Sequence, residues 1–188
     1  MGRIEPFTPW KLVIGILFAG AEPPPALGPR LEAEFGEADY TSPVLPFTYT
    51  DYYTQEMGTP LGRRFFGFRR LVGPERLADI KIATNKIEEE YPRQATGGPG
   101  RQVNLDPGIL NLSRFILATT KDNSHRIPLE KGIYAELTLR YTRKDFEALP
   151  WTYPDYATRE YRDILREIRE IFHQTLKREA AFRCNKEV

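Results

Sequence analysis

Four short runs in which apolar and polar residues alternate constrain the fold of this chain most strongly. They lie near 101–105, 114–120, 125–129 and 133–142. Alternation with a period of two is typical of β-strands that bury one face of a sheet. Because short polar connections separate the later runs, we expect hairpins there. This part of the chain is therefore expected to form a sheet.

The remaining elements alternate between strands and helices. We expect further strands at 11–19, 44–50 and 63–72, and helices at about 30–36, 74–90 and 154–181. The order strand-helix-strand, strand-helix-strand predicts an α+β fold with a ferredoxin-like βαββαβ core, an added antiparallel hairpin and a long C-terminal helix. Right-handed crossovers would place both early helices on one face of the sheet. Thr152 and Asp155 have the spacing of a capping box, which we expect to open the last helix.

The composition is that of one soluble globular domain. The 188 residues are 40% hydrophobic and 28% charged, with a net charge of +1. This balance predicts no global attraction to nucleic acid or to an anionic membrane. We therefore expect a single domain over 1–188, with a sheet core at 10–150 and a C-terminal helix at 151–182 that packs on the core or extends from it.

The cysteine content and the apolar runs indicate a cytoplasmic protein. The single cysteine, Cys184, excludes an intrachain disulfide and a CxxC metal site, which fits a reducing compartment. The longest apolar run, Leu12 to Ala19, is about half as long as a membrane span, and no basic region precedes it. We interpret it as a buried strand and expect neither a signal peptide nor contact with a membrane.

The loop 130–132 sets the register of the last predicted hairpin. A three-residue turn with Gly132 in the left-handed conformation pairs Leu129 with Ile133. A two-residue turn would mix apolar and charged side chains on both faces, which a half-buried sheet resists. The first register gives one face made of His125, Ile127, Leu129, Ile133, Ala135, Leu137 and Leu139.

The same register separates two groups of polar side chains. Arg126 lies directly opposite Glu136 as a cross-strand ion pair, whereas His125 points to the other face. A hairpin through the loop before His125 would pair Thr120 with His125 and Thr119 with Arg126. A site that uses both His125 and Glu136 is therefore disfavoured.

Polar side chains that could bind or transform a ligand concentrate in and near these strands. We take His125, Asp106 and Glu136 as candidate catalytic residues, because a histidine and two carboxylates can transfer protons. The candidate ligand-binding residues are the cationic Lys121 and Arg126, together with Thr119, Thr120, Asp51, Tyr52, Glu56, Lys81 and Asn85. No metal ligand is assigned, although carboxylates that the fold brings together could hold a divalent ion as cofactor.

Each candidate also has a structural interpretation. A histidine at the end of a strand is often a hydrogen-bonded boundary residue, and the Arg126–Glu136 pair can be purely structural. Asp106 begins an Asp-Pro-Gly sequence that is typical of a turn. Lys81 and Asn85 share one face of the predicted helix at 74–90, and such a face is usually solvated.

The strand at 63–72 offers a second kind of function. Its segment Phe66-Gly67-Phe68 matches part of the aromatic strand motif of RNA-recognition modules, which stack bases on exposed aromatic rings. Phe65 stands where that motif has glycine. The two matching phenylalanines project to the same face, and the alternative is that they belong to the hydrophobic core.

Several longer segments carry a resemblance to a known family. They are PFTYTDYYTQEMG (46–58), IKIATNKIEEE (80–90), VNLDPG (103–108), LATTKDNSHRIPLEKGIYAELTL (117–139) and WTYPDY (151–156). Together they resemble an uncharacterised bacterial family, domain of unknown function 4416, from Lys11 into the C-terminal helix. The resemblance implies that the candidate residues other than Thr119 and Thr120 belong to the family pattern. It implies no reaction.

Some members of that family are labelled GTP-binding proteins. This sequence has no Walker A lysine, no Asp-x-x-Gly and no Asn-Lys-x-Asp motif, since Asn85-Lys86 is followed by Ile87-Glu88. A G-x-S-x-G elbow, an H-E-x-x-H motif and a dinucleotide-binding fingerprint are also missing from it. No specific catalytic signature is therefore present.

Three functional hypotheses follow. The leading one is a cytoplasmic protein that binds a small anionic ligand, such as a nucleotide or phosphorylated metabolite, in a polar cleft, with or without chemistry. The second is an RNA- or protein-binding module that uses Phe66, Phe68 and the long helix, although the net charge makes nucleic acid the less favoured partner. The third is a scaffold with no small-molecule site. The C-terminal helix is also a candidate contact for a homodimer.

Overall fold

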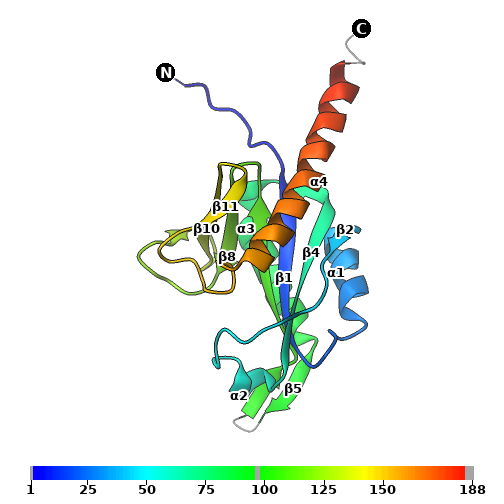
Figure 1. The fold of residues 1–188 in the computed structure, drawn as a ribbon, viewed down its shortest axis with the longest axis vertical. Helices are drawn as coiled ribbons and strands as arrows, with labels where there is room; N and C mark the ends of the chain where they lie inside the picture. Colours follow the sequence, from blue (N-terminus) through cyan, green and yellow to red (C-terminus); the bar gives the residue numbers. More distant parts are fainter. Residues whose placement is uncertain (1, 96–97, 185–188) are drawn as a thin grey trace.

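The computed structural model describes residues 2–95 and 98–184, which form an α+β fold built on one large sheet (Figure 1). Every neighbouring pair of strands in this sheet is antiparallel. The order of its main path is β11 (Asp145–Ala148), β10 (Tyr134–Thr142), β8 (Arg114–Thr119), β7 (Val103–Leu110), β1 (Trp10–Ala19), β4 (Leu61–Val72) and β2 (Ala38–Thr41). Two short strands lie off this path: β3 (Leu45–Pro46) pairs with β4, and β9 (Ile127–Pro128) pairs with β10. β5 (Pro92–Ala95) pairs with β6 (Gly98–Arg101) in a separate two-stranded antiparallel sheet.

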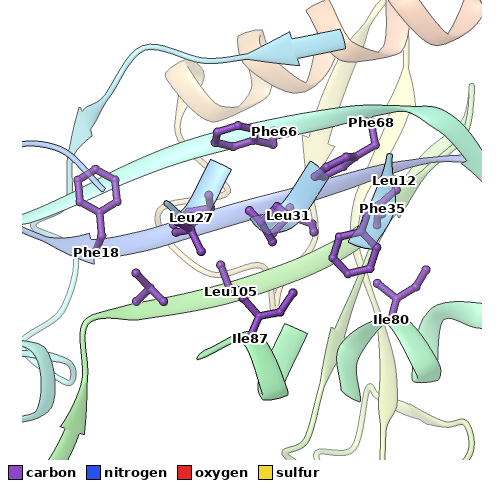
Figure 2. Close-up of a cluster of buried hydrophobic side chains, with 13 residues drawn as sticks. Leu12, Phe18, Leu27, Leu31, Phe35, Phe66, Phe68, Ile80, Ile87 and Leu105 are labelled. Carbon is purple, nitrogen blue, oxygen red and sulfur yellow. The ribbon is translucent and has the colours of Figure 1, made fainter. Parts of the chain in front are cut away.

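Helices cover both faces of the sheet. α1 (Leu27–Phe35) and α3 (Leu77–Glu89) pack against the same side of β1, as the crossover rule predicts (Figure 2). The 3₁₀ turn η1 (Pro74–Arg76) leads into α3, and α2 (Thr54–Met57) lies in the connection between β3 and β4. α4 (Arg159–Cys184) packs on the opposite side of the sheet.

β1 is the centre of the sheet because its side chains are apolar on both faces. Leu12, Ile14 and Ile16 pack with α1 and α3, whereas Val13 packs with α4. A strand between two layers of helices is expected to be a continuous apolar run, which explains the segment from Leu12 to Ala19. Each side chain of this size contributes about 1.5–3 kcal/mol when fully buried. The interpretation of this run as a buried strand is confirmed.

α4 has the predicted buried stripe but begins later than predicted. The hydroxyl of Thr158 accepts a weak hydrogen bond from the Tyr161 amide (3.4 Å), and the helix starts at Arg159. The proposed capping box is wrong because its two members have other partners. Thr152 donates to the Thr138 carbonyl (2.6 Å), and the carboxylate of Asp155 contacts a buried arginine described below.

The early elements differ from the prediction in their bounds. The expected strand at 44–50 is replaced by β2 and the two-residue β3, because Pro46 cannot donate a hydrogen bond to a sheet. α1 begins at Leu27 rather than near position 30, since proline at position 29 is tolerated in the first turn of a helix. Both differences arise at prolines.

The aromatic pair of β4 is part of the core. Phe66 and Phe68 lie beneath α1, and Phe68 is 0% exposed (Figure 2). Their rings stack on each other with centroids 6.5 Å apart. Rings covered by a helix cannot stack on nucleic-acid bases. The hypothesis that this strand binds RNA through Phe66 and Phe68 is therefore wrong.

The turn at 130–132 is confirmed, but the hairpin before His125 is not. Gly132 has φ +76°, and Ile127 pairs with Ala135 as predicted. β8, however, pairs directly with β10, so β10 lies between β8 and β9. Thr119 lies opposite Tyr134, not opposite Arg126. A long neighbouring strand thus displaces the local hairpin that the loop length suggested.

A bulge in β10 divides the face that was predicted to be uniform. The register with β8 shifts between Leu137 and Leu139. Ala135 therefore packs on the α3 side of the sheet, whereas Leu139 packs on the α4 side. Simple alternation fails at this point because the bulge adds one residue to one strand.

β7 and β8 separate after a short hairpin. Their pairing extends only from Gly108–Leu117 to Leu110–Phe115. Towards Val103, β7 keeps β1 as its partner but has no strand on its other edge in the described part of the chain. The backbone groups of that edge need other partners. This gap between β7 and β8 positions the candidate site.

The close approach of β7 and β8 at Gly108 gives a stability prediction. A Cβ atom on Gly108 would lie 2.5 Å from the Phe115 ring and 2.8 Å from the Ile116 carbonyl oxygen. We expect Gly108→Ala to lower the free energy of unfolding by about 1–3 kcal/mol in urea denaturation. Gly28→Ala is the control, because its Cβ would meet nothing closer than Phe66 at 3.9 Å. Unchanged stability of Gly108→Ala would contradict this close approach.

Candidate functional site

A cavity of about 930 Å³ opens where β7 and β8 separate. The segment around α2, the helix α3 and the loop before α4 complete its wall. Most candidate residues line it: Tyr52, Glu56, Lys81, Asn85, Asp106, Thr119, Thr120, Lys121 and Glu136. Asp51, His125 and Arg126 lie outside the lining. The fold thus brings together polar residues that are far apart in the sequence.

α3 supplies the partners that the free edge of β7 lacks. The Lys81 ammonium donates to the Leu105 carbonyl (2.8 Å), and the Leu105 amide donates to Oε1 of Glu88 (2.7 Å). Arg101 makes an ion pair with the other oxygen of Glu88. Lys81 is 7% exposed and Glu88 is 5% exposed, so this face of the helix is buried rather than solvated. Burial raises the pKa of Glu88, against the opposing effect of Lys81 and Arg101.

A buried arginine forms the centre of the charged network under the cavity. Arg63 of β4 is 2% exposed and packs over the Phe47 ring. Its guanidinium donates to Oδ2 of Asp106 (2.7 Å) and contacts Oδ2 of Asp155 (3.4 Å). The charge of this arginine is therefore held between two carboxylates, one from β7 and one from the loop before α4.

Asp106 is fully engaged by its neighbours. Its Oδ2 accepts from Arg63, and its Oδ1 accepts from the side-chain Nδ2 of Asn104 (2.8 Å). Burial would raise the pKa of Asp106, but the charges of Arg63 and Lys81 and these two hydrogen bonds hold it below its ordinary value. Asp106 therefore acts as the ionised partner of Arg63 in this structure.

Glu136 is held by two neighbours through one of its oxygens. Its Oε2 accepts from Nε of Arg126 (2.8 Å) and lies 3.0 Å from Nε2 of His125. The His125 ring stacks on Trp151, with centroids 5.2 Å apart. Arg126 also donates to the Tyr153 hydroxyl (2.8 Å). The predicted Arg126–Glu136 ion pair is confirmed, although Arg126 lies just before β9 rather than within a strand opposite Glu136.

The prediction that His125 and Glu136 lie on opposite faces is wrong. Alternation applies only within a strand, and β9 contains only Ile127 and Pro128. Just before it, the Arg126 amide donates to the Asn123 carbonyl (2.9 Å) in a turn. This turn lets consecutive side chains at 125 and 126 reach the same carboxylate.

Three further candidates, Tyr52, Thr119 and Thr120, lie with Lys121 in the lining of the cavity. The Lys121 ammonium contacts the Tyr52 hydroxyl (3.3 Å) and lies 4.4 Å from the centre of the Tyr52 ring. The Thr119 hydroxyl accepts from the Lys121 amide (3.2 Å), and Thr120 is the next residue along the rim. Glu56 makes an ion pair with Arg101 (2.9 Å).

The structure also adds site residues that the sequence analysis did not assign. Arg63, Glu88, Arg101 and Asp155 line the cavity and carry most of its ion pairs. The arginines at the start of β4, directly before the apolar run from Phe65 to Phe68, were the one usable signal, because a buried charge needs a partner. The positions of the other three depend on tertiary packing.

A metal site has no support in this geometry. Within 2–95 and 98–184, no group of three or more His, Cys, Asp or Glu side chains is arranged to hold a metal ion. The carboxylates of the cavity contact arginines instead, as the pairs of Asp106 and Glu136 illustrate.

The comparisons with known proteins identify a family. The model of the family described as "Domain of unknown function (DUF4416)" matches residues 8–172. The chain belongs to this family. The matched span includes the whole cavity lining, from Phe47 to Tyr156. No curated protein and no solved structure matches the chain.

None of the described helices, including the long α4, is long and apolar enough to span a membrane.

The Arg63–Asp106 pair gives a pH-dependent prediction for this family member. We expect Asp106→Asn to lower the free energy of unfolding by about 3 kcal/mol at pH 7, because it leaves a buried arginine with one carboxylate fewer. The folded pKa of Asp106 lies below its unfolded value of 3.8. Its stabilisation is therefore present above that pH and is lost as the pH falls through the folded pKa.

The measurement is urea denaturation of the two proteins between pH 3 and 7. The difference between wild type and Asp106→Asn should be largest above about pH 5 and should shrink towards pH 3. Asp79→Asn, an exposed aspartate paired with Lys131, is the matched control and should have little effect. A difference that stayed constant across this range would contradict the assignment.

Proposed function

We propose that this protein binds a small anionic ligand, such as a nucleotide or a phosphorylated metabolite, in the cavity between β7 and β8. A volume of about 930 Å³ fits a ligand of that size. One observation carries the proposal: Lys121 is the cationic lining residue that has no carboxylate partner in the described chain. Its ammonium is therefore available to a negatively charged group.

Apart from Lys121 and the exposed Glu89, which makes no ion pair among the described residues, the charged residues of the lining are paired with opposite charges. The acidic residues that contact an arginine are Glu56, Glu88, Asp106, Asp155 and Glu136. Lys81 is already engaged by Leu105 and Glu88. Lys121 differs because it contacts only the neutral side chain of Tyr52. An anion at the rim could thus contact the ammonium of Lys121, which makes no ion pair with a carboxylate of the described residues.

Neutral groups of the lining favour the same kind of ligand. The buried hydroxyl of Tyr156 has no hydrogen-bond partner among the described residues. It can donate to a phosphate or carbonyl oxygen. Tyr52, Tyr53 and Tyr153 add flat amphipathic surfaces against which a ring of the ligand can pack. Nothing in this arrangement requires a chemical step, and binding alone is proposed.

We also propose that β1, α1, β2, β4, α3 and β7 form a ferredoxin-like core. The spatial order β7-β1-β4-β2, antiparallel throughout, supports this assignment, as do the two helices on one face. β8, β10, β11 and α4 would then be additions that build the far wall of the cavity.

A cytoplasmic location is proposed from the single cysteine of the sequence. The homodimer expected at the C-terminal helix also stays a prediction. Mass measurement in solution tests it, and a monomer would contradict it.

The function can be tested by removing the free charge. A panel of nucleoside phosphates, sugar phosphates and inorganic phosphate is screened by thermal shift, where a ligand at 100 times its Kd adds about 2.7 kcal/mol. Binding is then measured by calorimetry. We expect Lys121→Ala to weaken binding by about 10- to 100-fold, the usual effect of losing one hydrogen bond to a charged group.

Lys131→Ala is the matched control, because Lys131 is exposed, pairs with Asp79 and lies outside this cavity. It should leave binding unchanged. The proposal fails if no member of the panel binds, or if Lys121→Ala and wild type bind equally well.

A further inference from the structure

One carboxylate oxygen in the cavity is left without a partner. Glu136 is 1% exposed, and its Oε1 is buried with no hydrogen bond among the described residues. A buried acceptor that lacks a donor costs free energy, and more so when it is charged. Such a group in a cavity wall is a candidate contact for a ligand.

The neighbours of Glu136 hold it in place. Oε2 is fixed by Arg126 and His125. Arg126 is fixed in turn by the Tyr153 hydroxyl and by the Lys121 carbonyl (2.8 Å). A side chain positioned by so many contacts needs little reorganisation to bind a ligand, which favours a recognition role.

The direction of the side chain fits this role. Glu136 lies opposite Leu117 of β8, and residues directly opposite each other project to the same face of a sheet. Both residues line the cavity. Three other lining carboxylates differ, because both oxygens of Asp106, of Glu88 and of Asp155 accept hydrogen bonds.

We propose that Oε1 of Glu136 accepts a hydrogen bond from a hydroxyl or N–H group of the ligand. This inference rests on the proposed function and narrows its ligand class. The ligand is then an anionic metabolite that also carries a neutral donor, as ribonucleotides and sugar phosphates do. A ligand with acceptor atoms only would leave Oε1 unpaired.

Arg126 connects the two ends of the proposed site. It donates through Nε to Glu136 and through a terminal nitrogen to the carbonyl of Lys121. The anion contact at Lys121 and the donor contact at Glu136 are thus held by one guanidinium. A ligand that bridges them would contact both Lys121 and Glu136, whereas inorganic phosphate would contact only Lys121.

The experiment compares ligands and variants by calorimetry. The probes are ribonucleoside 5′-monophosphates, their 2′,3′-dideoxy counterparts, glucose 6-phosphate and inorganic phosphate. In Glu136→Gln, the amide oxygen must face Arg126, so the amide nitrogen faces the cavity and presents a donor. We expect this variant to bind the hydroxyl-bearing phosphates about 10- to 100-fold more weakly. Inorganic phosphate should bind as it does to wild type.

The wild-type protein supplies a readout that does not depend on the folding of a variant. If the donor is a sugar hydroxyl, the dideoxy nucleotides should bind at least about tenfold more weakly than the ribonucleotides. If the donor is on the base, the binding affinity should instead depend on which base the nucleotide carries. Equal binding of all probes to wild type overturns the inference.

The outcomes separate the two proposals. If Lys121→Ala weakens every probe and Glu136→Gln weakens none, the proposed function stands and the role of Glu136 is wrong. If Glu136→Gln weakens inorganic phosphate as much as the other probes, Glu136 acts through the fold, and the inference is again overturned. If no probe binds the wild-type protein, both proposals fail.

Discussion

Between Val103 and Asp106, no strand of the described residues pairs with the outer edge of β7, and two buried charged side chains of α3 bind its backbone instead. Lys81 binds the Leu105 carbonyl and Glu88 accepts from the Leu105 amide, so one residue of the strand keeps both of its backbone hydrogen bonds. A buried backbone group without a partner is costly. Because side chains of α3 supply these partners, β8 can separate from β7 without destabilising the sheet. The cavity exists because of that separation.

The charges around the cavity follow from the same arrangement. Each buried ionised group needs an opposite charge, and Arg63 and Arg101 each meet two carboxylates. Most charged groups of the network are therefore paired with an opposite charge within it. Apart from the exposed Glu89, the groups of the lining that lack an opposite charge or a donor include the ammonium of Lys121 and one oxygen of Glu136, and the ligand hypothesis rests on these two.

The sequence was most informative where structure is local. Apolar runs located β1, β4, β8, β10 and the stripe of α4, and Gly132 located the turn between β9 and β10. The choice of β10 rather than β9 as the partner of β8 is a competition between distant segments, which loop length cannot decide. Most of the candidate residues do line one cavity, although only tertiary packing could bring them there.

The errors at the site also have physical reasons. His125 was assigned to the wrong face because β9 ends after two residues, and alternation does not continue into a turn. The helix face with Lys81 was expected to be solvated because sequence alone cannot show a backbone edge that needs a donor. Arg63 was not assigned because its partners, Asp106 and Asp155, are 43 and 92 residues away.

The central claim is that one ligand bridges Lys121 and Glu136 inside this cavity. A crystal structure of the protein grown with a ribonucleoside 5′-monophosphate tests it most directly. The account predicts the phosphate within hydrogen-bonding distance of Nζ of Lys121, and a hydroxyl or N–H of the ligand about 2.7–3.2 Å from Oε1 of Glu136. A nucleotide bound elsewhere, or an Oε1 paired with another side chain of the protein, would contradict the account.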